Sequence, residues 1–277
     1  MTALLATSDP VLLEFAELVR TEGKVAVEGN RTRWDVGGML DAEARVLSAP
    51  EGIVDYKPDE MTAVVRAGTT VAELHAALAE KGQRSALPER GGTVGGALAV
   101  GESDFRSLGR GLIRTCLLQI RYVSAEGRII SSGGPTVKNV SGFDLPRLMV
   151  GSLGTLGLMA EAIIRTNPIP PASQWLSAPG VPTRVVADAV LAPSSLYEHE
   201  GTTWVQIEGH AADVTAEIAV LKNSGDFDEV DAPDETQRPA PAPKIAVDAV
   251  VSALNDQIKR NFDPDGRLNP GRDVLAA

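Results

Sequence analysis

The sequence predicts a mixed α/β or α+β fold over residues 1 to about 168. Short apolar segments with the alternation of strands, such as "KVAVEG" and "TAVVRAG", are interleaved with amphipathic segments that carry helix-capping residues. Glycine-rich passages separate several of these segments. With 277 residues, 43% of them apolar, the chain is long enough to bury a substantial core in one large domain or two lobes.

Two N-terminal helices are indicated by their capping residues. Asp9 followed by Pro10 has the order of an N-cap and a first helical residue, and apolar residues recur at helical spacing after it. Thr70 and Glu73 have the spacing of a capping box in "TTVAELHAALAEKG". A last helix is predicted in "KIAVDAVVSALNDQIKRNF", residues 244–262.

The strands expected after the first helix begin with "KVAVEG", "GIVDY" and "TAVVRAG". The segment "LLQIRYVSAEGRIISSGG" reads as a β-hairpin that turns at Glu126 and Gly127. A further strand, "LMAEAIIRTNP", ends at Pro168. The fingerprint G-x-G-x-x-G of a Rossmann dinucleotide site is absent, so this class of site is not supported.

A change in composition marks the domain organisation. The proline-rich stretch "NPIPPASQWLSAPGVPTR" indicates a domain edge, and "TTWVQIEGHAADVTAEIAVLKNSG" predicts one strand and one helix. The following "SGDFDEVDAPDETQRPAPAP" is acidic and then proline-rich, as in a solvated linker. We therefore expect a main domain, a small cap or substrate region, an acidic linker, and a C-terminal helix with its tail, at residues 1–170, 171–223, 224–243 and 244–277.

The net charge of −11 argues against sequence-independent nucleic-acid binding, which requires Lys and Arg to neutralise phosphates. No apolar run approaches 18 residues, so no membrane span is predicted, and no signal peptide is expected at the N-terminus. The single cysteine, Cys116, excludes an internal disulfide and a Cys-rich metal site and is expected to be a buried thiol. This composition fits a cytoplasmic protein without a bound metal.

Glycine is concentrated in three loops, at about residues 29–38, 91–101 and 133–157. Residues 133–157 alone hold six glycines in 25 positions. Consecutive backbone N–H groups in such loops bind anions, and a diphosphate is the natural ligand. Close packing of turns is the alternative interpretation of each loop taken alone.

The order of these segments resembles the FAD-binding domain of the vanillyl-alcohol oxidase and p-cresol methylhydroxylase (PCMH-type) superfamily. Within it, the chain is most similar to the FAD-binding small subunit of glycolate oxidase. "VAVEGNRTRWDVGG" and "GGTVGGALAVG" match the family's first two pyrophosphate loops, and "VKNVSGFDLPRLMVGSLGTLGLMAEAIIR" matches its third. The resemblance implies an α+β, PCMH-type, two-part FAD-binding domain with a much reduced α/β cap region.

The resemblance also implies which residues contact the cofactor. In the first two loops these are Gly29, Asn30, Arg31, Thr32, Thr93, Gly95 and Gly96. In the third loop and the tail they are Asn139, Ser141, Gly142, Asp144, Gly151, Gly154, Gly157 and Asn269. Relatives with covalent flavin often carry a histidine in the first loop, and this chain has none there, so noncovalent FAD is expected.

The activity implied by the resemblance is oxidation of an alcohol to a carbonyl by hydride transfer to flavin. The expected substrate is a small 2-hydroxy acid or another alcohol. The expected partners are a larger flavin subunit and an iron–sulfur subunit, which would allow peripheral attachment to the inner membrane. Two alternatives stay open: a self-sufficient small FAD-dependent alcohol or sugar oxidoreductase, and a noncatalytic FAD-binding assembly subunit.

Catalytic residues are harder to identify from this sequence. The only histidines are His75, His199 and His210, and their spacing does not indicate a metal site. His210 follows the strand "WVQIEG" and is a candidate general base, and Arg267 in the tail is a candidate ligand for a substrate carboxylate. The alternative for both is an ordinary residue at the protein surface.

Overall fold

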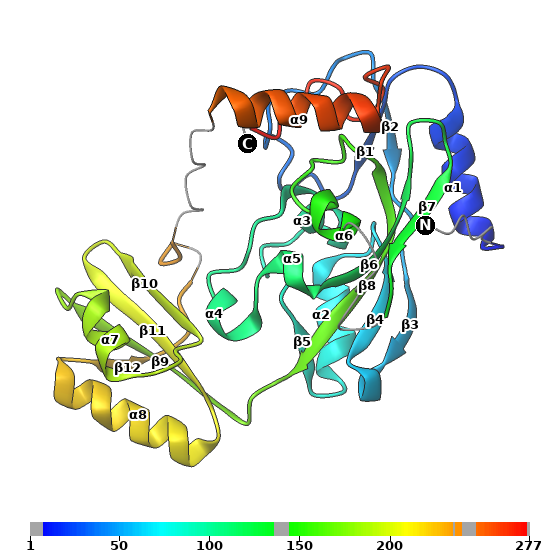
Figure 1. Ribbon diagram of the computed structural model, residues 1–277. Coiled ribbons are helices and arrows are strands. Elements are labelled where there is room, and N and C mark those ends of the chain that lie inside the picture. Colours follow the sequence, from blue (N-terminus) through cyan, green and yellow to red (C-terminus); the bar gives the residue numbers. More distant parts are fainter. Residues whose placement is uncertain (1–7, 136–143, 235, 240–247, 276–277) are drawn as a thin grey trace.

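The computed structural model describes residues 8–135, 144–234, 236–239 and 248–275. Figure 1 shows two lobes: a larger one that contains α1–α6, β1–β8 and α9, and a smaller one that contains β9–β12, α7 and α8. The mixed helix and strand content expected from the sequence is therefore confirmed.

The larger lobe is built on an antiparallel sheet with the strand order β3-β4-β8-β6-β7, to which β5 adds by pairing with β8. The strands are β3 (Ile53–Lys57), β4 (Thr62–Arg66), β5 (Gln83–Ser85), β6 (Leu117–Val123), β7 (Ile129–Gly133) and β8 (Leu158–Pro168). A separate parallel pair consists of β1 (Val25–Glu28) and β2 (Arg45–Ser48), and Val25 also bridges to Leu268 of the tail.

Helices cover both faces of this sheet. On one face, α1 (Pro10–Arg20) packs Leu12, Phe15 and Val19 against Leu158 and Ala160 of β8. On the other face lie α2 (Val71–Ala79), α3 (Val94–Val100), α5 (Ile113–Cys116) and α6 (Leu145–Met149), whereas α4 (Ser107–Arg110) contacts the smaller lobe. The alternation of side chains along a strand thus divides the hydrophobic core into two clusters.

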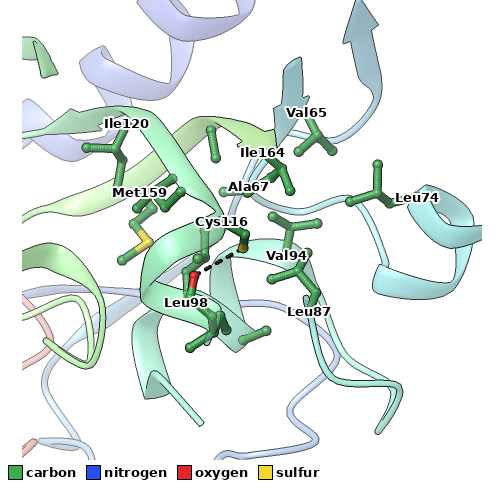
Figure 2. Close-up of a cluster of buried hydrophobic side chains, with 14 of the residues drawn as sticks. Val65, Ala67, Leu74, Leu87, Val94, Leu98, Cys116, Ile120, Met159 and Ile164 are labelled. Carbon is green, nitrogen blue, oxygen red and sulfur yellow. Dashed lines mark hydrogen bonds between the residues drawn. The ribbon is translucent and has the colours of Figure 1, made fainter. Parts of the chain in front are cut away.

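The larger cluster is shown in Figure 2. Leu74 of α2, Leu98 of α3 and Ile164 of β8 are fully buried there. Cys116 points into the same cluster and donates to the backbone carbonyl of Ile113 at 3.1 Å. Burial raises the pKa of this thiol to about 12, so the expected buried, unreactive cysteine is confirmed.

The local predictions for the larger lobe are confirmed in detail. Asp9 caps α1 through the backbone N–H groups of Val11 and Leu12, and Thr70 and Glu73 form the capping box of α2. The hairpin of β6 and β7 turns at Gly127, whose φ is 74°. The sequence did not indicate the short elements β2, β5, α3, α4, α5 and α6.

The smaller lobe has more structure than the expected single strand and helix. It consists of β9 (Ala172–Pro179), α7 (Thr183–Ala189), β10 (Ser195–His199), β11 (Thr202–Gly209), α8 (Ala211–Ser224) and β12 (Asp228–Val230). Its antiparallel sheet has the order β10-β11-β9-β12. A β-α-β-β-α-β chain with this order is a complete ferredoxin-like unit.

The prediction of a linker at residues 224–243 is wrong for the first residues of this range. Phe227 is buried in the core of the smaller lobe, and β12 pairs with β9 through Glu229 and Leu176. The buried side chain of Phe227 and the pairing of Asp228–Val230 with the edge of β9 give this acidic stretch an ordered structure. The smaller lobe therefore extends to Val230 at least.

The two lobes contact each other through polar and aromatic side chains. Arg84 of β5 donates from both Nη atoms to the two carboxylate oxygens of Glu208 on β11, at 2.7 Å each, and both side chains are largely buried. Phe105 of the larger lobe packs against Trp175 and Tyr197 of the smaller lobe. These contacts form a clamp between the lobes.

The C-terminal segment returns to the larger lobe. Helix α9 (Ala249–Phe262) begins at the N-cap Asp248, within the predicted range of 244–262, and lies across the top of this lobe in Figure 1. Lys259 donates to the carbonyl oxygen of Thr155 at 2.7 Å and to Asp263. The tail after α9 is thereby held against the third glycine loop.

Candidate functional site

A groove lies where the first and second glycine loops, the end of the third loop and the C-terminal tail meet. It consists of two adjoining hollows of about 610 and 390 Å³, part of which is open to solvent. The residues that line both hollows are Val27, Gly29, Thr93, Gly96, Ala99 and Asn269. Segments far apart in the sequence thus form one concave site, as is usual for a cofactor site.

Glycines allow the first loop to pack closely on the second, and the second to pack on the residue that follows β4. A Cβ atom at Gly29 would lie 2.4 Å from Oγ1 of Thr93, and one at Gly95 would lie 2.8 Å from the Cβ of Ala67. The Gly95 N–H donates to the carbonyl of Ala67 at 2.7 Å. Gly96 meets only Oγ1 of Thr93, its N-cap, and leaves the wall of the groove open.

Asn269 connects the tail to the two loops on either side. Its Oδ1 accepts from the backbone N–H of Val27 at 3.1 Å, and its Nδ2 donates to the carbonyl of Leu153 at 2.7 Å. Gly154, with a φ of 69°, makes room for this side chain, because a Cβ atom there would lie 2.3 Å from Nδ2. The side-chain amide of Asn269 therefore links β1 to the third loop, and these two segments form walls of the groove.

Left-handed backbone conformations are concentrated in this groove. In the described part of the chain, five residues other than glycine have a positive φ, and three of them, Arg31, Leu153 and Asn269, line the larger hollow. Such conformations cost on the order of 1–3 kcal/mol each and persist where the surrounding structure enforces them. Each of the three lies on a different segment, so the strain is a property of the assembled site.

The side chains that line the larger hollow carry positive charge, opposite to the net charge of the whole chain. Arg31, Arg33 and Arg272 line the larger hollow, and no carboxylate is among its lining residues. The guanidinium carbons of Arg31 and Arg272 each lie 4.9 Å from the centroid of the Trp34 ring, a cation–π geometry. In a protein of net charge −11, this cluster favours an anionic ligand.

Arg33 is the most buried of these three cations, with a side chain that is 9% exposed. Its Nη1 donates to the carbonyl of Gly91 at 3.1 Å, and its Nε lies 3.5 Å from a carboxylate oxygen of Glu102. Its Nη2 is buried and has no hydrogen-bond partner among the described residues. Burial lowers the pKa of Arg33, and Glu102 partly offsets this, but a guanidinium remains charged in proteins.

The other predicted cofactor residues fall into four groups. Asn30 and Thr32 line the larger hollow, and Gly95 and Gly154 line the smaller one. Gly151 and Gly157 are packing positions outside these lining sets, and a Cβ atom at Gly157 would lie 2.3 Å from the ring of Tyr122. Asp144 caps α6 by accepting from the N–H of Arg147. Asn139, Ser141 and Gly142 lie outside the described residues.

The two catalytic candidates are not in the groove. His210 is the exposed N-cap residue of α8 in the smaller lobe, away from β1 and α3 in Figure 1. Arg267, expected to hold a substrate carboxylate, donates instead to the carbonyls of Val19, Thr21, Gly23 and Ala125. It thus supplies hydrogen bonds to carbonyls at the C-terminal end of α1 and has no pair of N–H groups free to bind a carboxylate. The expectation that Arg267 holds a substrate carboxylate is therefore corrected.

A serine–histidine pair elsewhere has no access to a substrate. His75 Nε2 lies 2.7 Å from Oγ of Ser85, and Glu89 lies 3.6 Å from Nδ1. Ser85 is fully buried, however, so this arrangement has no open position for an acyl group. The described residues also hold no group of three or more His, Cys, Asp or Glu placed to bind a metal ion.

Sequence reasoning missed Arg33 and Trp34 as groove residues. The available signal was the presence of two arginines and a tryptophan in "GNRTRWD", in a chain with few aromatic residues. It also missed Lys259, whose hydrogen bond to Thr155 of the third loop depends on the path of the C-terminal segment, and Asp263, which accepts from Lys259. None of the helices in the described ranges is both long and apolar enough to cross a bilayer.

Comparison with known proteins agrees with this geometry. Residues 5–133 match the family model described as FAD binding domain. The chain is 29% identical over 224 residues to the glycolate oxidase subunit GlcE of Escherichia coli (strain K12), an alignment that covers 77% of this chain and 64% of that protein. It is 36% identical over 137 residues to a D-lactate dehydrogenase of Archaeoglobus fulgidus, covering 48% of this chain and 31% of that protein.

The fold is also found in solved structures. An alkyldihydroxyacetonephosphate synthase superposes with a TM-score of 0.61 at 16% identity, over 91% of this chain and 53% of that one. The chain thus spans less than two thirds of the length of the relatives described here. Residues 5–133 thus match an FAD binding domain, and the chain shares the fold of this solved structure.

Proposed function

We propose that the chain is an FAD-binding subunit of a glycolate-oxidase-like dehydrogenase that oxidises 2-hydroxy acids. The observation that carries the proposal is the groove itself, where three glycine loops and the tail meet and where three arginines and no carboxylate line the larger hollow. The names of the relatives, a glycolate oxidase subunit and a D-lactate dehydrogenase, support the class of substrate.

The residues present fit a dinucleotide with a diphosphate. Gly29, Asn30, Arg31 and Thr32 would hold the diphosphate from one side, and Thr93 and Gly96 from the other. The unpartnered Nη2 of Arg33 and the open wall at Gly96 are the features that an anionic ligand would complete. Gly95, Gly154 and Gly157 contribute through close packing, Gly151 through its positive φ, and Asn269 through its hydrogen bonds with Val27 and Leu153.

Bound FAD supplies the hydride acceptor for oxidation of a C–OH group. The chain's own residues hold and orient the cofactor and keep water from its diphosphate. None of the three histidines lines the groove, so this chain has no assigned base for the hydroxyl proton. Loss of such a base costs about 10²- to 10⁴-fold in rate. We therefore propose that substrate turnover depends on assembly with other subunits.

The proposed partners are a larger flavin subunit and an iron–sulfur subunit. The word "subunit" in the name of the E. coli relative supports a multi-subunit enzyme. We propose a cytoplasmic location, with peripheral attachment to the inner membrane through a partner.

The test is spectroscopic. The purified protein should be yellow, and acid or heat should release all of its flavin as FAD, because no histidine is available in the first loop for covalent attachment. Under anaerobic conditions, glycolate or D-lactate should bleach the isolated protein's flavin far more slowly than that of the assembled enzyme. Colourless protein that takes up no FAD would overturn the proposal. Rapid bleaching of the isolated chain would favour a self-sufficient oxidoreductase, and no bleaching even in the assembly would favour a noncatalytic FAD-binding subunit.

A further inference from the structure

One wall of the larger hollow is formed by two segments from opposite ends of the chain. Residues 34–41 include the end of the first glycine loop, and residues 270–273 belong to the C-terminal tail. We refer to these two segments together as the flap. The flap residues that line the larger hollow are Trp34, Val36, Leu40 and Arg272. A movement of the flap would therefore change the width of this hollow.

Main-chain hydrogen bonds join the two segments of the flap. The Asp41 N–H donates to the Pro270 carbonyl at 2.9 Å. The Asp273 N–H donates to the Gly37 carbonyl at 2.8 Å. Two bonds of this kind, one at each end of residues 270–273, hold the tail along the first segment and keep the flap closed.

Gly271 and Arg272 determine how closely the tail lies on the first segment. A Cβ atom at Gly271 would lie 2.4 Å from the carbonyl oxygen of Met39, and the φ of Gly271 is 89°, so only glycine allows this approach. Arg272 donates from Nη1 to two carbonyls of residues 34–41, and its guanidinium carbon lies 4.9 Å from the centroid of the Trp34 ring. The closed position thus depends on a glycine that does not itself line either hollow.

The flap has little buried apolar surface to hold it in place. Gly37 is its one buried residue, and Met39 is 88% exposed. No flap residue belongs to the hydrophobic core clusters of the described chain. Two residues before residue 270, by contrast, Leu268 is fully buried and anchors the tail. Because segments with few buried apolar contacts open at a small fraction of the global free energy of unfolding, we expect the flap to open while the rest of the lobe stays folded.

We propose that the flap is a gate for cofactor exchange, and that FAD enters and leaves the groove when residues 270–273 separate from residues 34–41. This inference rests on the proposed function and adds to it how the loading of the site is controlled. If exchange requires an open flap, the association and dissociation rate constants both rise with the open fraction, while their ratio, the dissociation constant, changes little. A fixed wall that only contacts the ligand would act mainly on the dissociation rate constant.

The test compares Gly271→Ala with Gly266→Ala in flavin-free protein. The added methyl group at position 271 would meet the Met39 carbonyl and favour the open flap. Gly266 is a matched control in the same tail, since its φ is 64° and nothing lies within 4 Å of its Cβ position. Stopped-flow flavin fluorescence measures FAD association, and dilution of the loaded protein measures its release. Thermal unfolding controls for folding, and hydrogen exchange at the Asp41 and Asp273 amides measures opening directly.

In Gly271→Ala both rate constants for FAD should rise about 10-fold, because overpacking destabilises the closed flap by an amount of this order. The dissociation constant for FAD should change less than about threefold, because free and loaded protein are affected alike. The two amide hydrogens should exchange faster than in the wild type. Gly266→Ala should change each rate constant less than about threefold, as for a surface substitution away from the flap.

Unchanged rate constants in a folded Gly271→Ala protein would overturn the gate, and so would a rise confined to the dissociation rate constant or an equal rise in Gly266→Ala. The wild type alone provides a further check. If its Asp41 and Asp273 amides exchanged as slowly as those of β8, the flap would not open separately, and the gate would be overturned without any variant. In all these cases FAD still binds and the proposed function stands. If the wild-type protein bound no FAD, the proposed function would fail, and the gate with it.

Discussion

Glycines have different structural roles in the two lobes. In the larger lobe, a Cβ atom at Gly29, Gly95 or Gly154 would come within 2.3–2.8 Å of another segment. In the smaller lobe, Gly180 and Gly201 have a φ of 73° with nothing within 4 Å of the Cβ position. These two glycines of the smaller lobe thus serve turns alone, whereas the three glycines of the larger lobe allow separate segments to pack closely around the groove.

The largest effect is expected from a branched side chain at a crowded glycine. Gly154→Leu should abolish FAD retention, because the new side chain would displace Asn269 from between the loops. Overpacking typically costs 1–3 kcal/mol and left-handed backbone roughly 1–2 kcal/mol, so the thermal stability should also fall.

Gly201→Leu is the matched control for that variant. Its φ of 73° is close to the 69° of Gly154, but it has open space around it, so it should suffer only the backbone strain and keep its flavin. Flavin stoichiometry by absorbance and unfolding by circular dichroism measure both quantities. Equal flavin content in the two variants would remove the distinction between crowded and open glycines.

The second largest effect concerns the clamp between the lobes. Arg84→Met leaves the carboxylate of Glu208 buried without its bidentate partner, and loss of one member of a buried pair costs about 3–5 kcal/mol. The unfolding midpoint of the smaller lobe should fall by several degrees while FAD affinity stays near that of the wild type. The double variant Arg84→Met/Glu208→Met should recover most of the stability, because it leaves no unpaired charge. A large loss of FAD from the single variant would show that the clamp supports the groove.

Replacement of Asn269 should have a smaller effect. Asn269→Ala removes the hydrogen bonds to the Val27 N–H and the Leu153 carbonyl, with an expected loss of about 2 kcal/mol in stability. FAD affinity should fall with it, because the groove's walls lose their common support. Asn261→Ala, an exposed position on α9, is the control and should leave both quantities unchanged. Stability and FAD affinity like those of this control would contradict the positioning role of Asn269.

The smallest effect is a dependence of stability on acid pH. Burial raises the pKa of Glu89, but the guanidiniums of Arg110 and Arg106 outweigh this and bring it to about 2, below its ordinary 4.5. A depressed pKa stabilises the folded state above the unfolded value, so this contribution should be lost as the pH falls from about 4.5 towards 2. Glu89→Gln should flatten that part of the pH profile of the unfolding midpoint. If the unfolding midpoint of Glu89→Gln depended on pH as in the wild type, groups other than Glu89 would be responsible for the loss of stability in acid.

The structure confirms the predictions that depended on neighbouring residues. The cap of Asp9 on α1, the capping box of Thr70 and Glu73, and the turn at Gly127 all follow from spacing within a few positions. The meeting of the glycine loops at one groove could be anticipated only from the order of motifs. The residues assigned there as cofactor ligands stay predictions.

Features that depend on distant pairing were not visible in the sequence. β12 is only three residues long and acidic, and it is a strand because β9, about 50 residues earlier in the chain, offers it an edge. The guanidinium of Arg267 is of the type that binds a substrate carboxylate. In the fold, however, it donates to backbone carbonyls at the C-terminal end of α1. The donor left over on Arg33 is equally a product of three-dimensional burial.

The contact between the two ends of the chain has a consequence for the order of events in biosynthesis. Val25 and Val27 of β1 depend on Leu268 and Asn269 for their bridge and their hydrogen bonds. The ribosome makes these partners some 240 residues after β1. The groove therefore cannot be completed before residue 269 has emerged from the ribosome, and we expect cofactor loading to begin only after that point.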